Sequence, residues 1–262
     1  MSKPKVVILC GGRGTRINEE TEFKPKPLVE IGGKPILWHI MSVYAHYGFN
    51  EFVLCLGYKG NMIKEYFLNY NLYANDFTMT LNGDSQIDMH TGNHLDWKIT
   101  FADTGLNSLK GSRLKQIEKY IYTDNFFLTY GDGVADVNIN SLLEFHQKHN
   151  KTVTLSGVRP PSRFGDILID KDSGKILEFT EKSQASAGMI NGGFFVLNRK
   201  VFAHVNADQN CDFEYGPLED LAQNGEVMAY QHPGSWECMD NVREMQHLNK
   251  LWDSGKAFWK VW

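Results

Sequence analysis

The chain has 262 residues, of which 42% are hydrophobic and 13% aromatic, so it can bury the core of one large α/β domain or of two small ones. Lys and Arg number 27 against 31 Asp and Glu, and no long run of one sign occurs. The charge therefore argues against nonspecific nucleic-acid binding, and the lack of any apolar stretch of about 20 residues argues against a membrane span.

The N-terminal stretch and the cysteines both favour a cytoplasmic location. Residues 1–5 lead directly into an apolar run, without the longer apolar region of a signal peptide. The cysteines are scattered, and two of them lie in strand-like apolar contexts where a buried, reduced thiol is the usual interpretation: Cys10, Cys55, Cys211 and Cys238. We therefore expect free thiols.

The first structured stretch, Val6–Cys10, is an unbroken apolar run that predicts a strand buried on both faces. It ends in a glycine-rich loop of six residues: Gly11, Gly12, Arg13, Gly14, Thr15 and Arg16. Three glycines in four positions permit positive φ and leave a concave row of N–H donors that suits phosphate oxygens. The hydroxyl of Thr15 and the planar cation of Arg16 add donors for phosphate.

Two lysines follow on a rigid segment, because Lys24 and Lys26 alternate with Pro25 and Pro27. Strand, glycine loop, arginine and lysines together indicate a triphosphate site. Two familiar phosphate-binding patterns do not fit. The dinucleotide pattern has Ile17 where its third glycine is required, which excludes a dehydrogenase of that kind, and the P-loop pattern also fails.

Strand-like and helix-like segments alternate along most of the chain. Strands are predicted at 51–56, 97–102, 126–130, 153–158 and 193–197, a hairpin at 167–180, and helices at 36–48, 59–69, 115–121, 142–149, 218–223 and 242–252. This alternation predicts an α/β fold with parallel strands and helical crossovers. Segment 72–96 lacks a clear period and is expected to be an insertion or lid. No linker or repeat is visible, so we expect a single domain, 1–262.

Aspartates follow the run 126–130, where ligands bind in parallel α/β sheets. Asp132 lies between glycines and could hold Mg²⁺ against phosphates, although an isolated aspartate here could equally form a turn or helix cap. Asp136 suits the capping role better, because it precedes a helical run. Asp240 could complete a metal site with Asp132 or could cap the last helix, and sequence spacing does not decide between these.

A second group of polar residues lies in the C-terminal half of the chain. Lys182, after an apolar strand, could neutralise a phosphate, and Asn191 could bond sugar hydroxyls. Taken singly, such a lysine is more often a solvated charge, and Asn-Gly-Gly is more often a turn.

The motifs taken together resemble the signature of the sugar-nucleotide pyrophosphorylases: G-G-x-G-T-R, then K-P-K-P, then G-x-K-P-[IL]. The resemblance covers nearly the whole chain and is weakest through 72–96. It implies a Rossmann-like nucleotidyltransferase fold, that is, a mixed, mostly parallel sheet flanked by helices with a small β-rich acceptor-binding portion. The nucleotide half would span roughly 1–135 and the acceptor half roughly 136–262.

The same resemblance implies a role for each candidate residue. Arg16 and Lys26 would be catalytic, and Asp132 and Asp240 would hold Mg²⁺. The nucleotide would be bound by Leu9, Gly11, Gly12, Arg13, Gly14, Thr15, Thr104, Arg113 and Gly131, and the acceptor by Glu181, Lys182, Asn191 and Gly192.

Within the family, the runs at 24–40, 129–136, 189–198 and 232–240 most resemble the members that join CTP to glucose 1-phosphate. The expected substrates are therefore CTP and a sugar 1-phosphate. The sequence departs from the family pattern at Cys10, at Arg13 and in 84–94. These departures bear on the identity of the acceptor more than on the type of reaction. Two alternatives stay open: a cytidylyltransferase with another phosphorylated acceptor, and a nucleotide sensor without turnover.

The family resemblance also bears on the oligomeric state of the protein. It implies a homo-oligomer, with no nucleic-acid or membrane partner. The aromatic C-terminal residues Phe258, Trp259 and Trp262 could form an interface patch or could pack on the chain's own core.

Overall fold

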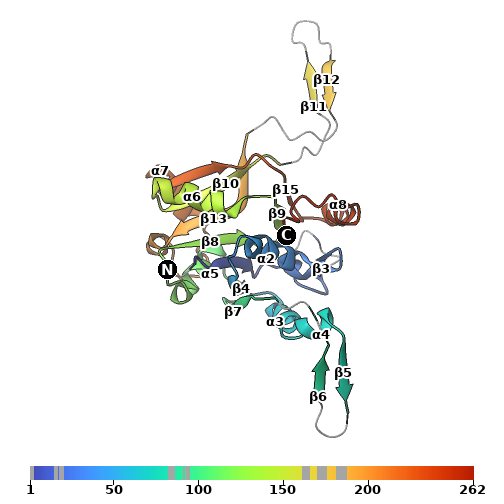
Figure 1. Ribbon diagram of the computed structural model, residues 1–262. Coiled ribbons are helices and arrows are strands. Elements are labelled where there is room, and N and C mark those ends of the chain that lie inside the picture. The colour runs from blue at the N-terminus through green and yellow to red at the C-terminus, as the bar shows by residue number, and fades with distance from the viewer. Residues whose placement is uncertain are drawn as a thin grey trace.

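The computed structural model describes residues 3–14, 17, 21–81, 86–90, 92, 95–160, 166–169, 176–180 and 188–262. Within these residues, seven strands form a central sheet in the order β14-β10-β13-β8-β1-β4-β7 (Figure 1). Their bounds are β1 Val6–Cys10, β4 Glu51–Leu56, β7 Lys98–Asp103, β8 Asn125–Tyr130, β10 Val153–Val158, β13 Ile190–Asn198 and β14 Val227–Gln231.

The sheet is mixed and mostly parallel, as predicted. Strand β1 runs parallel to β4 and β8, β4 to β7, and β10 to β14. Only β13 among the described strands of this sheet is antiparallel to its neighbours β10 and β8. The carboxyl ends of β1, β4, β7 and β8 therefore meet at one edge, where the glycine loop and Asp132 begin.

Helices cover both faces of the sheet. Their bounds are α2 Ile36–His46, α3 Gly60–Leu68, α4 Tyr70–Ala74, α5 Lys110–Gln116, α6 Ile139–His149, α7 Glu219–Gln223 and α8 Val242–Asp253. Short 3-10 turns lie at Lys26–Leu28, Glu118–Tyr120 and Arg199–Ala203, and an irregular helical turn at Glu214–Leu218.

Burial on both faces of the sheet accounts for the apolar sequence of β1. Val6 and Ile8 belong to the core beneath α2, α6 and α8, whereas Val7 belongs to the core beneath α5 and α7. Successive strand residues point to opposite faces, so a strand covered on both faces must be apolar at every position. All three side chains are 0% exposed.

Short two-stranded sheets add to this body. They are β2 (Glu30–Ile31) with β3 (Lys34–Pro35), β5 (Phe77–Thr80) with β6 (Gln86–Met89), β9 (Gly133–Ala135) with β15 (Trp236–Cys238), and β11 (Asp166–Ile169) with β12 (Ile176–Thr180). The pairs β5–β6 and β11–β12 project in opposite directions from the body (Figure 1). The second pair confirms the predicted hairpin, and its predicted turn lies outside the described residues.

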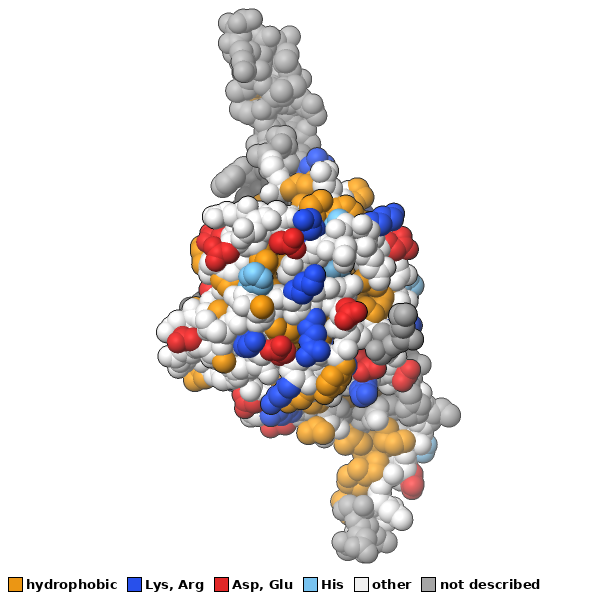
Figure 2. Space-filling model, turned by 90° about the vertical axis from the view of Figure 1, so that its left-hand side faces the viewer, with side chains coloured by type: hydrophobic (Ala, Val, Ile, Leu, Met, Phe, Trp, Pro, Cys, Tyr) orange, Lys and Arg blue, Asp and Glu red, His pale blue; other side chains and the backbone are white. Residues whose placement is uncertain are grey.

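The described part of segment 72–96 contains the end of α4 and the two projecting strands β5 and β6, and none of these described residues lines the pocket reported below. The prediction of a lid is therefore not supported by the described part of the segment. Apolar side chains gather on this projection (Figure 2), where Phe77, Met79, Ile87 and Met89 are each 39–45% exposed. Phe77 lies opposite Met89, and Met79 opposite Ile87.

The helix predicted at 115–121 is misplaced. The structure has α5 at Lys110–Gln116, followed by the separate turn Glu118–Tyr120. Gly111 and Ser112 are weak helix formers, and Leu109 provides no side-chain cap, so the true start carries no local signal.

The C-terminal residues pack on the chain's own core. Trp259 is 0% exposed, and its Nε1 donates to Nδ1 of His39, 3.3 Å away. In the part of the chain that is described, no helix is both long and apolar enough to cross a lipid bilayer.

Candidate active site

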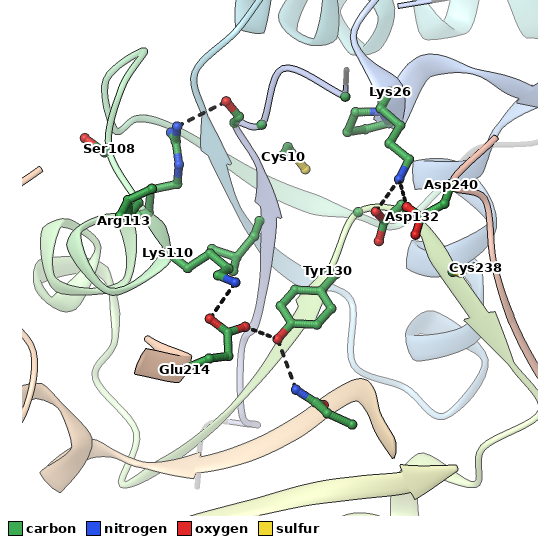
Figure 3. A pocket seen from close by; sticks show the side chains of 18 of the residues that line it. Cys10, Lys26, Ser108, Lys110, Arg113, Tyr130, Asp132, Glu214, Cys238 and Asp240 are labelled. Carbon is green, nitrogen blue, oxygen red and sulfur yellow. Dashed lines mark hydrogen bonds and ion pairs between the residues drawn. The ribbon is translucent and has the colours of Figure 1, made fainter. Parts of the chain in front are cut away.

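A pocket of about 560 Å³ opens at the carboxyl ends of the parallel strands. Its lining combines the glycine loop, the turn that carries Lys26, the loop before α5, the end of β8, the start of β13 and the strand β15 (Figure 3). The pocket therefore collects residues from both halves of the chain.

Lys26 is held between two carboxylates. Its Nζ lies 2.6 Å from Oδ2 of Asp132 and 2.6 Å from Oδ1 of Asp240 (Figure 3). The side chain extends from a turn fixed by Pro25 and Pro27, and the residue is buried. Burial acts to lower the pKa of Lys26, but Asp132 and then Asp240 outweigh it, so the net pKa is raised. The lysine is therefore a firmly charged ammonium at the base of the pocket.

The strand pair β9–β15 brings the two aspartates together. Gly133 pairs with Cys238, and the N–H of Met239 donates to the carbonyl of Asp132 over 2.9 Å. The following helix α8 is capped by Asn241, whose side chain accepts from the N–H of Glu244. Asp240 is therefore not the cap of that helix, and the capping alternative for it is wrong.

Asp136 is also not a helix cap, contrary to expectation. Asn138 caps α6 by accepting from the N–H of Ser141. Asp136 Oδ1 instead accepts from the N–H of Ser235 and lies 2.9 Å from Nε2 of His232. Burial alone would raise the pKa of Asp136, but the contacts with His232 and Ser235 lower it. Asp136 thus anchors the loop that leads to β15 and Asp240.

The two aspartates suit a hard divalent cation. Each places an oxygen within 2.6 Å of one and the same cationic atom, so their oxygens converge on a single point. Across the described ranges, no cluster of three or more His, Cys, Asp or Glu residues could hold a metal ion. The pair would therefore leave most ligand positions to water and substrate phosphates, a pattern typical of Mg²⁺.

The glycine loop lies beside the turn that carries Lys26, since a Cβ at Gly14 would lie 3.0 Å from Cβ of Lys26. Gly11, Gly12 and Gly14 line the pocket, and Gly14 has a φ of 63°. Arg13 is exposed and does not line it; its Nη2 donates to Oδ1 of Asn107 over 3.4 Å. Thr15 and Arg16, which were predicted to bind phosphate, lie outside the described residues.

Arg113 joins the ends of neighbouring strands. Its Nη1 donates to the carbonyl of Leu56 and to Oγ1 of Thr104, and its Nη2 donates to the carbonyl of Gly11. The residue is 4% exposed, and burial lowers the pKa of its guanidinium. Thr104 acts within this network and does not itself line the pocket, whereas Leu9 and Gly131 do.

On the acceptor side, Asn191 lines the pocket, and the carbonyl of Gly192 accepts from Nε1 of Trp236 over 2.7 Å. Trp236 also lines the pocket. Glu181 and Lys182 lie outside the described residues, so their predicted acceptor role stays a prediction.

Lys110, Tyr130, Glu214 and Trp236 line the pocket without having been predicted from sequence. The hydroxyl of Tyr130 donates a hydrogen bond to Glu214, and Lys110 Nζ lies 2.6 Å from the other oxygen of that carboxylate (Figure 3). Burial and then Glu214 raise the pKa of Tyr130, so its hydroxyl stays protonated. The sole sequence signal was the position of Tyr130, directly before Gly131 and Asp132.

These features define a class of protein. A glycine loop after the first strand of a mostly parallel sheet lies in one pocket with a lysine and a carboxylate pair, which is an arrangement for transfer of a nucleotidyl group between phosphates. The family model described as Nucleotidyl transferase matches residues 5–249, and the chain belongs to this family.

Relatives of known description agree with this assignment. The chain is 48% identical over 259 residues to glucose-1-phosphate cytidylyltransferase of Salmonella typhi, with 98% of this chain and 99% of that one covered. It is 46% identical over 258 residues to probable glucose-1-phosphate cytidylyltransferase of Bacillus subtilis (strain 168), with 98% and 100% covered. The predicted resemblance to the pyrophosphorylases is thereby confirmed.

Solved structures share the fold. The crystal structure of HddC from Yersinia pseudotuberculosis matches with a TM-score of 0.69 and 24% identity, covering 95% of this chain and 100% of that one. At this identity the match shows the fold alone, and it confirms the predicted α/β architecture.

Proposed function

We propose that the protein transfers a cytidylyl group from CTP to glucose 1-phosphate, giving CDP-glucose and pyrophosphate. The observation that carries the proposal is the contact of Lys26 with both Asp132 and Asp240 inside the pocket. The identity of 46–48% to glucose-1-phosphate cytidylyltransferases over nearly the full chain supports the choice of both substrates.

In the proposed reaction, an oxygen of the acceptor phosphate attacks the α-phosphorus of CTP in line. The bond from that phosphorus to the oxygen bridging to the β-phosphate breaks, and pyrophosphate leaves with the electron pair. No covalent intermediate with the protein is required, so the residues act by positioning and by neutralising charge.

The glycine loop and Arg16 are proposed to bind the β- and γ-phosphates, because backbone N–H groups and a guanidinium both match phosphate oxygens. Lys26 would meet the negative charge that grows on the α-phosphate, and Lys182 would anchor the acceptor phosphate. Because Lys26 is buried, water screens its charge poorly, and its ammonium stabilises the charge on the α-phosphate more strongly than an exposed lysine would.

Mg²⁺ is the proposed cofactor, held by Asp132 and Asp240. When bound, the ion would neutralise charge on the donor and acceptor phosphates. The support in this chain is the convergence of the two carboxylates on one point, the ammonium of Lys26.

Pyrophosphate release tests the proposed reaction. The enzyme is incubated with Mg²⁺, glucose 1-phosphate and, in turn, CTP, UTP, dTTP, ATP or GTP. Release with CTP alone is the expected result. Release with another nucleotide and not with CTP would contradict the proposed base, and release only with other phosphorylated acceptors would contradict the proposed acceptor.

Assembly and location are proposed as well. Apolar side chains on the projecting hairpin β5–β6, such as Met79 and Ile87, support a homo-oligomer, because a two-stranded hairpin with an uncovered apolar face is marginally stable in water. The four free cysteines support a reducing, cytoplasmic location. Light scattering of the purified protein tests the first, and fractionation of its host cell the second.

A further inference from the structure

The pocket has a second polar cluster that the proposed phosphate chemistry does not use. It consists of Lys110, Tyr130, Asn191 and Glu214, called here the distal wall. These residues come from the start of α5, the end of β8, the start of β13 and the turn before α7. The tertiary fold therefore assembles the distal wall from segments that are far apart in the sequence.

The hydrogen bonds of the distal wall have a fixed direction. The N–H of Gly193 can only donate, so the Asn191 atom that faces it at 2.9 Å is Oδ1. Asn191 Nδ2 then donates to the Tyr130 hydroxyl over 3.2 Å, and that hydroxyl donates to Glu214. Lys110 completes the series with its ion pair to Glu214.

Gly193 makes room for this arrangement. Its φ is 78°, and a Cβ at this position would lie 2.5 Å from the ring carbon Cδ2 of Tyr130. A side chain at residue 193 would thus collide with the ring of Tyr130. Gly193 consequently has a physical role: it lets Tyr130 lie against the backbone of β13.

The fixed directions determine what the distal wall can offer a ligand. Asn191 keeps one N–H and one lone pair, Tyr130 keeps one lone pair on its oxygen, and Lys110 keeps further N–H donors. Donors and acceptors thus alternate along the wall. This suits hydroxyl groups, since each hydroxyl both donates and accepts.

The charge of the distal wall disfavours an additional anion. Lys110 Nζ lies 2.6 Å from Glu214 and 3.7 Å from Asp212, so two carboxylates offset one ammonium. A second phosphate or a carboxylate placed against this wall would meet no uncompensated cation. A neutral polyol would meet only hydrogen-bonding partners.

The distal wall is also placed to receive the end of an acceptor that is remote from its phosphate. Tyr130 and Asp132 extend from the end of the same strand, and Tyr130 lies between the Lys26 cluster and the Lys110–Glu214 pair (Figure 3). A molecule with its phosphate at Lys26 and its body in the pocket would bring its far hydroxyls toward Tyr130.

We infer that Lys110, Tyr130 and Glu214, with Asn191, form a specificity-determining subsite that binds hydroxyls of a neutral sugar 1-phosphate and discriminates against sugars with a second anionic group. This inference rests on the proposed function, because it presupposes that a sugar 1-phosphate is the acceptor.

Two substitutions of opposite charge effect test the inference. Glu214→Gln removes one of the two negative charges beside Lys110, so the wall becomes more positive. Lys110→Gln removes the positive charge beside Glu214 and Asp212, so the wall becomes more negative. Steady-state kinetics at mildly alkaline pH compare glucose 1-phosphate with glucuronic acid 1-phosphate, and the readout is the ratio of their kcat/KM values. We expect Glu214→Gln to raise the ratio of glucuronic acid 1-phosphate to glucose 1-phosphate at least about fivefold and Lys110→Gln to lower it. A purely structural role would move both variants in the same direction.

Tyr130→Phe provides a conservative third variant that keeps the ring against Gly193. Loss of its hydroxyl should raise the KM for glucose 1-phosphate about tenfold while the KM for CTP changes less than about twofold. Circular dichroism of each variant checks the fold.

The outcomes separate the inference from the proposed function. Turnover by the unsubstituted enzyme, combined with an unchanged acceptor ratio in both charge variants and an unchanged acceptor KM in Tyr130→Phe, would overturn the inference alone. An unsubstituted enzyme that releases no pyrophosphate from CTP and glucose 1-phosphate would overturn the proposed function and the inference with it.

Discussion

Lys26 and Asp240 are separated by 214 positions in the chain, yet Nζ of the first lies 2.6 Å from Oδ1 of the second. The contact joins the segment after the glycine loop to the segment before the last helix. It depends on the short strand pair β9–β15, which carries Asp240 to the end of β8. The proposed catalytic centre is therefore a product of long-range pairing.

The first prediction concerns Lys26. Lys26→Ala should lower kcat roughly a hundredfold or more, because losing one preorganised donor to transition-state charge typically costs ~2.7–4 kcal/mol. Pyrophosphate release measures the effect, and circular dichroism checks the fold. Lys24→Ala is the matched control, since Lys24 does not line the pocket and its Nζ lies 3.6 Å from Glu30. Near-normal turnover in Lys26→Ala would remove Lys26 from the mechanism.

The second prediction concerns the aspartate pair. Asp132→Asn or Asp240→Asn should each weaken Mn²⁺ binding in the presence of CTP by more than roughly tenfold, because one of two protein carboxylate ligands is lost. Electron paramagnetic resonance of free Mn²⁺ measures binding without turnover. Asp124→Asn, at an exposed residue before β8, serves as the control. Equal Mn²⁺ affinity in all three variants would contradict the proposed metal site.

The third prediction concerns Arg113. Arg113→Met should lower the free energy of unfolding by roughly 1.5–3 kcal/mol for each hydrogen bond that the charged guanidinium loses. The carbonyls of Gly11 and Leu56 each lose one such bond, although each keeps a backbone N–H donor, from Tyr58 and Thr104 respectively. Because Gly11 belongs to the loop proposed to bind the phosphates of CTP, CTP affinity should fall as well. Urea unfolding and calorimetric CTP titration test both effects, with the exposed Arg199→Met as control. Wild-type stability in Arg113→Met would show that the guanidinium does not hold these strand ends.

The fourth prediction is a pH dependence of stability that originates at His39. The residue is 0% exposed; its Nδ1 accepts from Trp259, so its Nε2 carries the proton toward the carbonyl of Ile31, 2.8 Å away. Burial lowers the pKa of His39 from 6.5 to about 4. Between pH 6.5 and pH 4 the histidine takes up a proton in the unfolded state but stays neutral in the folded state. Protonation therefore favours unfolding, and the free energy of unfolding falls as the pH is lowered from 6.5 toward 4.

Urea unfolding between neutral pH and pH 4 should therefore show a fall in stability that includes up to ~3 kcal/mol from this histidine. His39→Gln should reduce the slope in that range, whereas His204→Gln, at an exposed side chain, should not. An identical slope in His39→Gln and the unsubstituted protein would place the pH dependence elsewhere.

The local signals of the sequence predicted most of the central sheet. The run Val6–Cys10 and the helix Val242–Asp253 carry their periods and ends in adjacent residues, and both lie where predicted. The strand β14 was missed because its residues are largely exposed and do not alternate in polarity. The start of α5 was missed because Gly111 and Ser112, in its first turn, are weak helix formers.

The site was predictable only where a motif or a strand end marks it. Asp132 follows a buried strand, so its position in the pocket could be inferred from sequence. Its approach to Asp240 could not, because the pairing strands β9 and β15 have only three residues each, and the family resemblance supplied that partner. Tyr130 and Glu214 meet only in the tertiary structure, and no spacing rule connects residues on such different elements.

The proposed reaction joins a cytidylyl group to a glucose phosphate, so the mass of the product reports on it without an intermediate assumption. The enzyme is incubated with CTP, Mg²⁺ and ¹³C-labelled glucose 1-phosphate, and the mixture is analysed by liquid chromatography and mass spectrometry. We expect labelled CDP-glucose and an equal amount of pyrophosphate, both greatly reduced in Lys26→Ala. Consumption of CTP without a labelled nucleotide sugar, or no consumption at all, would contradict the proposed reaction.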